Sequence, residues 1–304
     1  MIGELRCILI IPKIHSGVRA MKIKVWGCRG SITTPGPTTL RYGGNSTCLE
    51  IRTKGGQIII IDAGSGIRNL GTALSQEKNV TQIRFFITHS HWDHLTGFPF
   101  FKPAYSDTFS ITFCSGPHAQ DSIRKYLTHQ MEAPFFPVDF NLLRAKFDFQ
   151  CQRPHNEPGN CQLDGLQVCP IPLNHPNGGY GYKFIEQGKI FVFLTDNELG
   201  FQHEGGLSRA QYIDFCQNAD LLLHDAQFTE EEYKFTRGWG HSTFGDAMDL
   251  AIESGVKCLG LFHHDPDRTD DDLDRHVEFC RECIDKTGSR VKCFAATEGM
   301  GIEL

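Results

Sequence analysis

The stretch "ITHSHWDHLTG", residues 87–97, places three histidines and an aspartate within six positions, directly behind an apolar run. The preceding residues "QIRFFIT" have the pattern of a buried strand, so the cluster follows the carboxyl end of a strand, where α/β proteins place their chemistry. Imidazole and carboxylate side chains together suit zinc or a similar transition ion. The alternative is a polar loop that happens to be rich in histidine.

The spacing within this cluster is compatible with two metal ions. In an extended loop, the i, i+2 spacing of His89 and His91 lets both side chains hold one ion, while Asp93 and His94, in the first turn of the next element, face a second. Each ion needs further ligands, and isolated candidates stand at the ends of later predicted strands: His175 in "PLNHPNGG", Asp196 in "FLTDNE" and His263 in "LFHHDP". An acid between two ions can bridge them, and this role is expected of Asp196.

Composition narrows the class of protein. The 304 residues suffice for one large domain or two ordinary ones, and a formal net charge of −6 predicts no extended nucleic-acid surface. The twelve cysteines are scattered from Cys7 to Cys293, which predicts reduced thiols and a cytoplasmic protein. "CREC", from Cys280 to Cys283, has redox or zinc-knuckle spacing, but it lies in a predicted helix, where two semi-buried thiols fit better.

The first twenty residues, "MIGELRCILIIPKIHSGVRA", contain an apolar run that is too short for a secretory signal and is broken at Pro12. No other stretch approaches the ~20 apolar residues of a membrane span, so no membrane partner is expected. Residues 1–20 are interpreted as a small extension or as the result of a mis-set start ahead of Met21. Residues 21–304 are expected to form a single domain.

Strands and helices alternate along the rest of the chain. Strands are predicted at 22–27, 47–53, 56–64, 82–88, 110–115, 180–196 (two strands with a turn at Gly188), 220–226, 256–265 and 290–297. Helices are predicted at 65–76, 118–130, 207–219, 241–255 and about 270–286. Residues 130–165 are irregular and rich in proline and phenylalanine, and they suit a flap over the site, a contact between two copies of the chain, or a plain loop.

These motifs carry a family resemblance. "THSHWDHLTG" resembles the metal motif of the metallo-β-lactamase superfamily, and the order "IDAG", "THSHWDH", "NHPNG", "TD", "LFHHDP" is similar to that family's succession of five motifs. The resemblance covers nearly the whole chain from Met21. It implies an α/β fold of the four-layer αββα type, with a dinuclear metal site at one edge, between the two sheets.

The resemblance also assigns ligands. It implies one ion on His89, His91 and His175, a second on Asp93, His94 and His263, Asp196 between them, and Asp62 behind them, orienting ligands by hydrogen bonds. "HH" offers His264 as well as His263, and the family's pattern of Leu-x-His-x-x-Pro favours His263. The expected cofactor is two divalent ions, with Zn²⁺ as the default and manganese or iron as alternatives.

Two later stretches point to one branch of the superfamily. "LLLHDAQF" and "GWGHSTFGDAMDLA" look like elements of the ribonuclease Z and phosphodiesterase branch, whose members hydrolyse phosphodiesters. The resemblance implies that His241 contacts the scissile phosphate and protonates the leaving oxygen, with Asp225 orienting it or sharing its proton. Ribonuclease Z carries a glutamate where this chain has Asp225. The alternative for His241 is an ordinary residue beside a helix cap at Ser242 or Thr243.

The substrate is expected to be a small phosphodiester. Ribonuclease Z inserts a long arm for transfer RNA between the third and fourth ligand motifs, whereas twenty positions separate His175 from Asp196 here, so precursor tRNA is the second choice. Residues 26–51 are similar to small phosphodiesterases, including those that act on cyclic nucleotides or cyclic phosphates. Polar residues of this glycine-rich stretch either reach a phosphate or ribose or hold a hairpin together: Arg29, Ser31, Arg41 and Asn45.

The mechanism implied by the resemblance uses a water held between the two ions, with its pKa lowered from about 15.7 towards ~7. The resulting hydroxide attacks phosphorus, Asp93 serves in the catalytic centre as well as being a ligand, and His241 delivers a proton to the leaving oxygen. The alternatives are an endoribonuclease for tRNA 3′ ends, a thiolester or lactam hydrolase, and a member of the fold that binds metal without catalysis.

Overall fold

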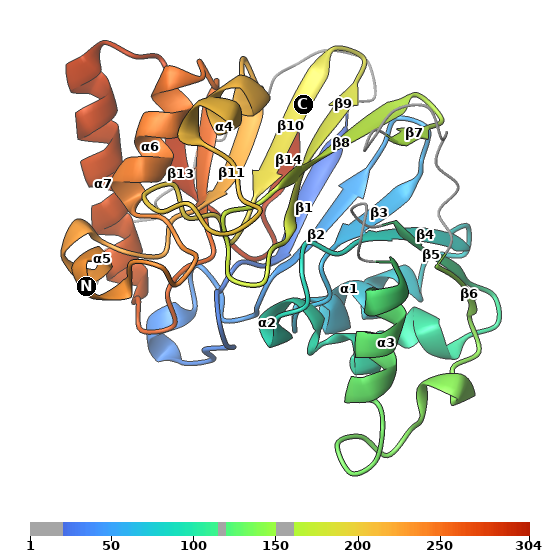
Figure 1. Cartoon of the computed structure of the whole chain (residues 1–304). Helices are drawn as coiled ribbons and strands as arrows, with labels where there is room; N and C mark the ends of the chain where they lie inside the picture. Colours follow the sequence, from blue (N-terminus) through green and yellow to red (C-terminus); the bar gives the residue numbers. More distant parts are fainter. Residues whose placement is uncertain (1–20, 115–119, 150–160) are drawn as a thin grey trace, which may run out of the picture.

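The structure is a computed structural model that describes residues 21–114, 120–149 and 161–304. The expected N-terminal extension and residues 150–160 of the irregular segment lie outside these ranges. In the described chain, two seven-stranded sheets lie face to face, with helices on both outer sides (Figure 1). The predicted four-layer αββα fold is therefore confirmed.

The first sheet has the strand order β14-β1-β2-β3-β4-β5-β6. Its strands are β1 (Lys22–Gly27), β2 (Cys48–Arg52), β3 (Ile58–Ile61), β4 (Gln82–Phe86), β5 (Ser110–Cys114), β6 (Lys146–Asp148) and β14 (Gly301–Glu303). The four strands from β3 to β6 are parallel. Their carboxyl ends therefore open on the same edge of the sheet.

The second sheet has the order β13-β12-β11-β10-β9-β8-β7. Its strands are β7 (Cys161–Leu163), β8 (Leu166–Pro172), β9 (Tyr180–Glu186), β10 (Lys189–Leu194), β11 (Leu221–Asp225), β12 (Cys258–Phe262) and β13 (Lys292–Ala295). Here the strands from β10 to β13 are parallel, and β9 and β10 form the predicted hairpin around Gly188.

The helices divide between the two outer faces. They are α1 (Ile67–Leu74), α2 (Trp92–Leu95), α3 (Gln120–Gln130), α4 (Arg209–Cys216), α5 (Glu230–Thr236), α6 (Phe244–Glu253) and α7 (Asp270–Thr287), with short 3₁₀ turns η1 (Pro37–Thr39), η2 (Phe98–Phe100), η3 (Lys102–Tyr105) and η4 (Phe140–Leu142). Buried residues of α1 and α3 pack on the first sheet, and those of α4, α6 and α7 pack on the second. On α7, Cys280 is buried and Cys283 is half-buried.

Strand alternation builds the layers. In β3, Ile59 and Ile61 belong to the core between the sheets, whereas Ile58 and Ile60 pack under the helices of the first sheet. β10 does the same with Phe191 and Phe193 inside, while its intervening residues face α4 and α6. Because successive side chains of a strand point to opposite faces, a continuous apolar run is what a strand covered on both sides requires.

Residues 130–165 are more regular than expected. The described part contains η4, β6 and β7, and three of its phenylalanines, Phe140, Phe147 and Phe149, join the aromatic cluster over the first sheet. Phe149 stacks on Phe113 of β5, with ring centroids 4.9 Å apart. These three phenylalanines thus serve the core, whereas Phe135 of the same segment is 65% exposed.

Candidate metal centre

The residues expected to bind metal lie where strands of both sheets end. Asp62, Asp196 and His263 follow β3, β10 and β12, and all three have a left-handed backbone, with φ of 61°, 51° and 57°. Such values are uncommon for residues other than glycine and concentrate at functional sites. The chain leaves each strand at a sharp turn, which aims these side chains at the gap between the sheet edges.

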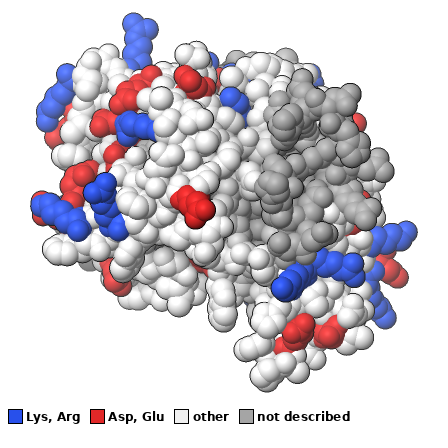
Figure 2. All heavy atoms as spheres, in the orientation of Figure 1, with Lys and Arg blue, Asp and Glu red and all other residues white. Residues whose placement is uncertain are grey.

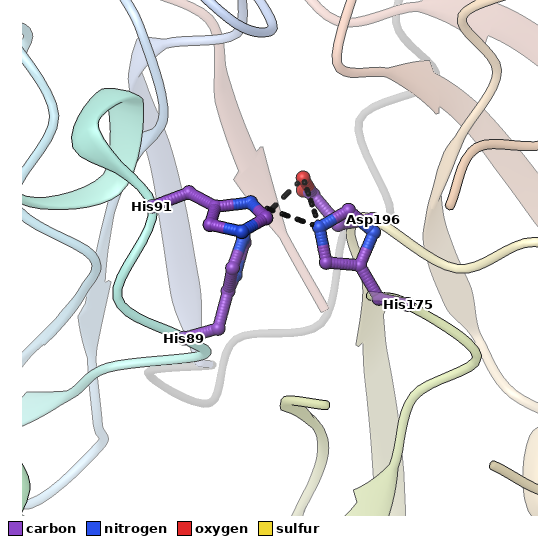
Figure 3. Close-up of side chains that lie close together, drawn as sticks. All are labelled: His89, His91, His175 and Asp196. Carbon is purple, nitrogen blue, oxygen red and sulfur yellow. Dashed lines mark hydrogen bonds and ion pairs between the residues drawn. The ribbon is translucent and has the colours of Figure 1, made fainter. Parts of the chain in front are cut away.

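A first cluster joins the loop after β4 to the second sheet. Figure 3 shows His89, His91, His175 and Asp196 converging on one point, and one ligand atom from each lies within 4.8 Å of all the others. His175 Nε2 is 3.0 Å from His91 Nδ1, and Asp196 Oδ2 is 3.6 Å from His89 Nε2 and 3.7 Å from His175 Nε2. These distances leave a position for one ion at the centre.

A second cluster shares Asp196 with the first. Its other members are Asp93, His94 and His263, and all four are buried. Asp196 Oδ1 lies 3.2 Å from His94 Nε2 and 3.3 Å from His263 Nε2, while Asp93 Oδ2 is 3.2 Å and 3.1 Å from the same two nitrogens. Asp196 thus presents one oxygen to each cluster, as a bridging carboxylate would.

Hydrogen bonds behind the clusters fix the orientation of the imidazoles. Asp62 Oδ2 is 2.8 Å from His94 Nδ1, and the same carboxylate accepts hydrogen bonds from the amide and hydroxyl of Thr88. Gly240 O is 2.9 Å from His175 Nδ1. Because one ring nitrogen is held in this way, the other is left to face the cluster. Asp62 therefore lies where the sequence placed it, behind a candidate ligand.

The geometry distinguishes His263 from His264 as the candidate metal ligand. His263 Nε2 is 3.1 Å from Asp93 Oδ2 in the second cluster, and its Nδ1 is 3.0 Å from Gln227 Oε1. His264 Nε2 instead lies 2.8 Å from the carbonyl of Ala296, away from both clusters. Adjacent residues at the end of β12 thus point to different surroundings, and it is His263 that lies in the cluster.

The protonation states of the first cluster suit metal binding. Burial lowers the pKa of His175 to about 4, and it lowers the pKa of His89 well below its usual value. Burial alone would raise the pKa of Asp196, but the surrounding histidines, His263 foremost, hold it well below its usual range. Neutral imidazoles and an ionised carboxylate are the forms in which these groups bind a metal.

Two buried atoms also indicate a missing partner. Within the described residues, His89 Nε2 and His94 Nε2 are buried and have no hydrogen-bond partner. Buried polar atoms are normally satisfied by a hydrogen bond, and a role in binding an ion is one accepted reason for an exception. One such atom belongs to each cluster. The donor sets therefore fit two divalent ions of the transition-metal type, since they combine imidazole nitrogens with carboxylate oxygens.

His241 and Asp225 form a pair beside the second cluster. His241 Nδ1 is 2.9 Å from Asp225 Oδ2, and its ring stacks on His263, with centroids 4.9 Å apart. Burial alone would lower the pKa of His241, but the charge of Asp225 and the hydrogen bond to it raise the pKa to about 9. The cap of α6 is Thr243, so His241 lies two positions before the cap.

The polar residues of the 26–51 loop mostly hold the loop itself. Arg29 is fully buried and donates to the carbonyls of Gly43, Asp265 and Arg268. The other three candidates are also engaged: Arg41 pairs with Asp271 and Asp274, Asn45 donates to Glu298, and the Ser31 amide donates to Asp93 Oδ2 at 2.9 Å. Ser31 is therefore the candidate of this group with a bond to the clusters. Substrate contact by these four residues stays a prediction.

Two supporting residues were not foreseen from the sequence. Gln227 contacts His263, and buried Glu198 accepts hydrogen bonds from the amides of Gly238 and Gly240, both at 2.7 Å. Glu198 stands two positions after Asp196 in "TDNE", and a carboxylate in an otherwise buried run was the available signal. Its partners lie forty positions further on, where no spacing rule would have placed them.

Comparison with known proteins agrees with this geometry. Residues 57–264 match the family model described as the beta-lactamase superfamily domain, and they include every residue of both clusters. The chain belongs to the beta-lactamase superfamily. Among its relatives is a protein named ribonuclease Z from Lactiplantibacillus plantarum, which is 24% identical over 258 residues, covering 72% of this chain and 80% of the relative.

Solved structures with this fold cover almost the whole chain. The metallo-β-lactamase fold protein YhfI from Bacillus subtilis superposes with a TM-score of 0.66 and 16% identity, covering 94% of this chain and 100% of YhfI. Unliganded yeast PDE1 gives a TM-score of 0.64 with 16% identity, covering 94% and 100%. At these identities the likeness establishes the fold, so the chemistry has to come from the site.

Proposed function

We propose that this superfamily member is a dinuclear metal-dependent hydrolase, and specifically a phosphodiesterase for a small cyclic nucleotide or cyclic phosphate. The observation that carries the proposal is the His241–Asp225 pair, 2.9 Å apart, set against a candidate ligand of the second cluster. A metal site alone is chemically permissive. A buried imidazole that is paired with a carboxylate beside it can supply the acid that breaking a P–O bond to an alkoxide requires.

When bound, two divalent ions would supply an activated water and positive charge beside the phosphoryl oxygens. His89, His91 and His175 would hold one ion and Asp93, His94 and His263 the other, with Asp196 shared. His241 then donates its proton from Nε2 to the departing oxygen. Asp225 holds the proton on Nδ1 and favours the charged imidazole before the transfer. A cyclic diester would open to a monoester.

Two features favour a small substrate over precursor tRNA. The interval between His175 and Asp196 is occupied by β9, a tight turn and β10, so it contains no arm. In Figure 2, acidic and basic side chains are mixed over the left of the visible face, and the basic side chains at the lower right have acidic side chains beside them. The described chain also lacks any helix that is both apolar and long enough to cross a membrane.

A tRNA 3′-processing endoribonuclease is the second candidate, because relatives that match over most of their length carry the name ribonuclease Z. Both candidates predict metal-dependent hydrolysis of a phosphodiester, and they differ in the size of the substrate. The test must therefore offer both substrates to the same preparation.

The test measures turnover of 3′,5′-cyclic AMP, an aryl phosphodiester and a precursor tRNA by metal-loaded and by chelator-treated protein. Metal-dependent turnover of cyclic AMP and of the aryl diester supports the proposal. Cleavage of the aryl diester but not of cyclic AMP would redirect the search to cyclic sugar phosphates, and rapid cleavage of the tRNA would favour the second candidate. Absence of all three activities in protein that retains two metal equivalents would refute phosphodiesterase function.

A further inference from the structure

Large apolar side chains are exposed beside the metal centre. Two of the three tryptophans, Trp92 and Trp239, are 82% and 63% exposed, and Ile32 is 61% exposed. The third, Trp26, is half-buried and donates its indole N–H to Glu50 at 2.8 Å. Exposed indoles lose the benefit of burial, and exposed apolar surface next to a functional site can serve binding.

Each of these side chains lies next to a residue of the site. Trp92 stands between His91 and Asp93, one from each cluster. Trp239 precedes Gly240, whose carbonyl contacts His175 Nδ1. His91 is also half-buried, whereas the other candidate ligands are buried.

Ile32 reaches the same region from another loop. It follows Ser31, whose amide donates to Asp93 Oδ2 at 2.9 Å. In three separate segments of the chain, the loop after β1, the start of α2 and the loop before α6, an exposed apolar residue is therefore the chain neighbour of a residue that belongs to a cluster or contacts one. We call Ile32, Trp92 and Trp239 the apolar rim.

The backbone that carries the rim is fixed. The amides of Gly238 and Gly240, on either side of Trp239, both donate to buried Glu198 at 2.7 Å, and the Trp239 amide donates to Thr236 O at 3.0 Å. The Trp92 carbonyl accepts a hydrogen bond from the Thr96 amide at 2.7 Å. Exposed side chains on a fixed backbone offer a prepared surface, which lowers the ordering cost of binding.

The rim is better suited to an uncharged flat group than to phosphate. Its three members carry no charge, and the neighbouring arginines are engaged elsewhere. Arg29 is held by three backbone carbonyls, and the Arg237 guanidinium lies 5.6 Å from the ring centre of Phe201. The anionic part of a ligand would therefore go to the metal centre and an aromatic part to the rim. A nucleotide combines these two parts.

We infer that the apolar rim is the nucleobase subsite of the centre, so that the substrate is a nucleotide rather than a cyclic sugar phosphate. This inference rests on the proposed phosphodiesterase function and narrows its substrate class. The base stacks on Trp92 or Trp239 while the cyclic phosphate lies at the metals. An aromatic face can stack on every base, so we expect little selectivity between purines and pyrimidines. Selectivity for nucleotides over esters without a base should be larger.

The test compares 3′,5′-cyclic AMP with the 3′,5′-cyclic phosphate of methyl riboside, which keeps the ring and replaces the base by a methoxy group. Wild-type protein should prefer cyclic AMP in kcat/KM. Trp92→Ala and Trp239→Ala should each be examined, and the substitution that removes the stacking ring should reduce this preference roughly tenfold or more. The matching Trp→Tyr variant should retain most of the preference for cyclic AMP. Phe279→Ala is the control, because Phe279 is a 55% exposed aromatic residue on α7.

A second readout does not depend on turnover. Binding of adenosine 5′-monophosphate to metal-loaded protein should quench tryptophan fluorescence, and ribose 5-phosphate should not. Equal kcat/KM for the two cyclic esters in wild type, or a preference unchanged in both alanine variants, would overturn the rim assignment and leave the phosphodiesterase proposal intact. If neither ester is hydrolysed, the aryl diester and precursor tRNA decide whether phosphodiesterase function fails, and the quenching result alone decides whether the rim binds a base.

Discussion

At the scale of single residues, the two roles at the centre can be separated by substitution. His241→Ala should keep both metal equivalents but lose most turnover, by about 10²–10⁴-fold, because it removes the proton donor and none of the expected ligands. Asp196→Ala should lose metal, because its two oxygens face both clusters. Metal content and kcat of the two purified variants are the measurements. Full activity of His241→Ala, or loss of its metals, would contradict these roles.

The grouping of the side chains into two clusters was predictable residue by residue, because the members of the clusters belong to short motifs at strand ends. His89, His91, Asp93 and His94 needed only their own spacing, and His175, Asp196 and His263 followed from the order of motifs. The support behind them was not predictable. Gln227 and Glu198 act through pairings of 36 and up to 42 positions that depend on how loops from different strands meet.

At the scale of elements, one buried carboxylate ties the loop between α5 and α6 to the first cluster. Glu198 accepts hydrogen bonds from Tyr233 Oη at 2.6 Å, from His203 Nε2 at 2.8 Å, and from the amides of Gly238 and Gly240. Gly240 approaches His175 so closely that a Cβ there would lie 2.0 Å from its Nδ1. A shift of this loop must therefore disturb His175.

We expect Glu198→Gln to weaken binding of the ion of the first cluster selectively. The NH2 group of glutamine is a hydrogen-bond donor, and it would face groups that now donate their hydrogen bonds to the carboxylate of Glu198. In a chelator titration, the metal ion held by His175 should be removed at a chelator concentration roughly 10- to 100-fold lower than in wild type. The concentration that removes the second ion should change little. Glu231→Gln, on the exposed side of α5, is the control. Equal weakening of both ions would indicate a general loss of structure instead.

The start of β11 offers a pH-dependent contact remote from the metals. Asp220 accepts hydrogen bonds from Lys257 Nζ at 2.8 Å and the Ile190 amide at 2.9 Å. Burial alone would raise the pKa of Asp220, but these donors hold it below its usual value. A pKa that is lower in the folded state than in the unfolded state stabilises the protein at pH values above the unfolded-state pKa of about 3.9. This contribution is lost as the pH falls through the folded-state pKa.

Asp220→Asn should therefore lower the free energy of unfolding by about 1–3 kcal/mol at pH 7, and the difference from wild type should shrink below about pH 4. Urea denaturation at both pH values, in chelator so that metal loss does not contribute, measures the effect. Asp214→Asn, on the exposed side of α4, provides the control. A difference that persists unchanged at low pH would show that shape rather than charge is responsible.

Elements were predictable where the apolar pattern was simple. The continuous run of β3 and the two strand-like runs on either side of the Gly188 turn predicted strands at the observed places. β6 and β7 were missed because each has three residues, too few for a period to be recognised, and because the phenylalanine-rich stretch around them also suited a flap or a contact between two copies of the chain. Only the position of this segment against Phe98 and Phe113 makes it core.

At the scale of the whole molecule, the centre lies between the two halves of the sandwich. His89, His91, Asp93 and His94 follow β4 of the first sheet, whereas His175, Asp196 and His263 come from loops of the second. Without ions, buried carboxylates and imidazole nitrogens face one another across this junction. Bound ions would therefore act as links between the sheets as well as serving the chemistry.

Removing the metals should consequently lower the melting temperature. An ion present at a thousandfold excess over its Kd adds about 4 kcal/mol to the free energy of unfolding. In a domain approaching this size, a change of about 1 kcal/mol shifts Tm by roughly 2–4 °C. Loss of even one ion should therefore lower Tm by on the order of 10 °C. Thermal denaturation of metal-loaded and chelated protein measures the shift. Asp196→Ala should show little of this shift in melting temperature, because both clusters lose an oxygen and the variant has little bound metal to remove. An equal shift in that variant would mean that the stabilising ions bind elsewhere, and no shift in wild type would mean that the two sheets hold together without them.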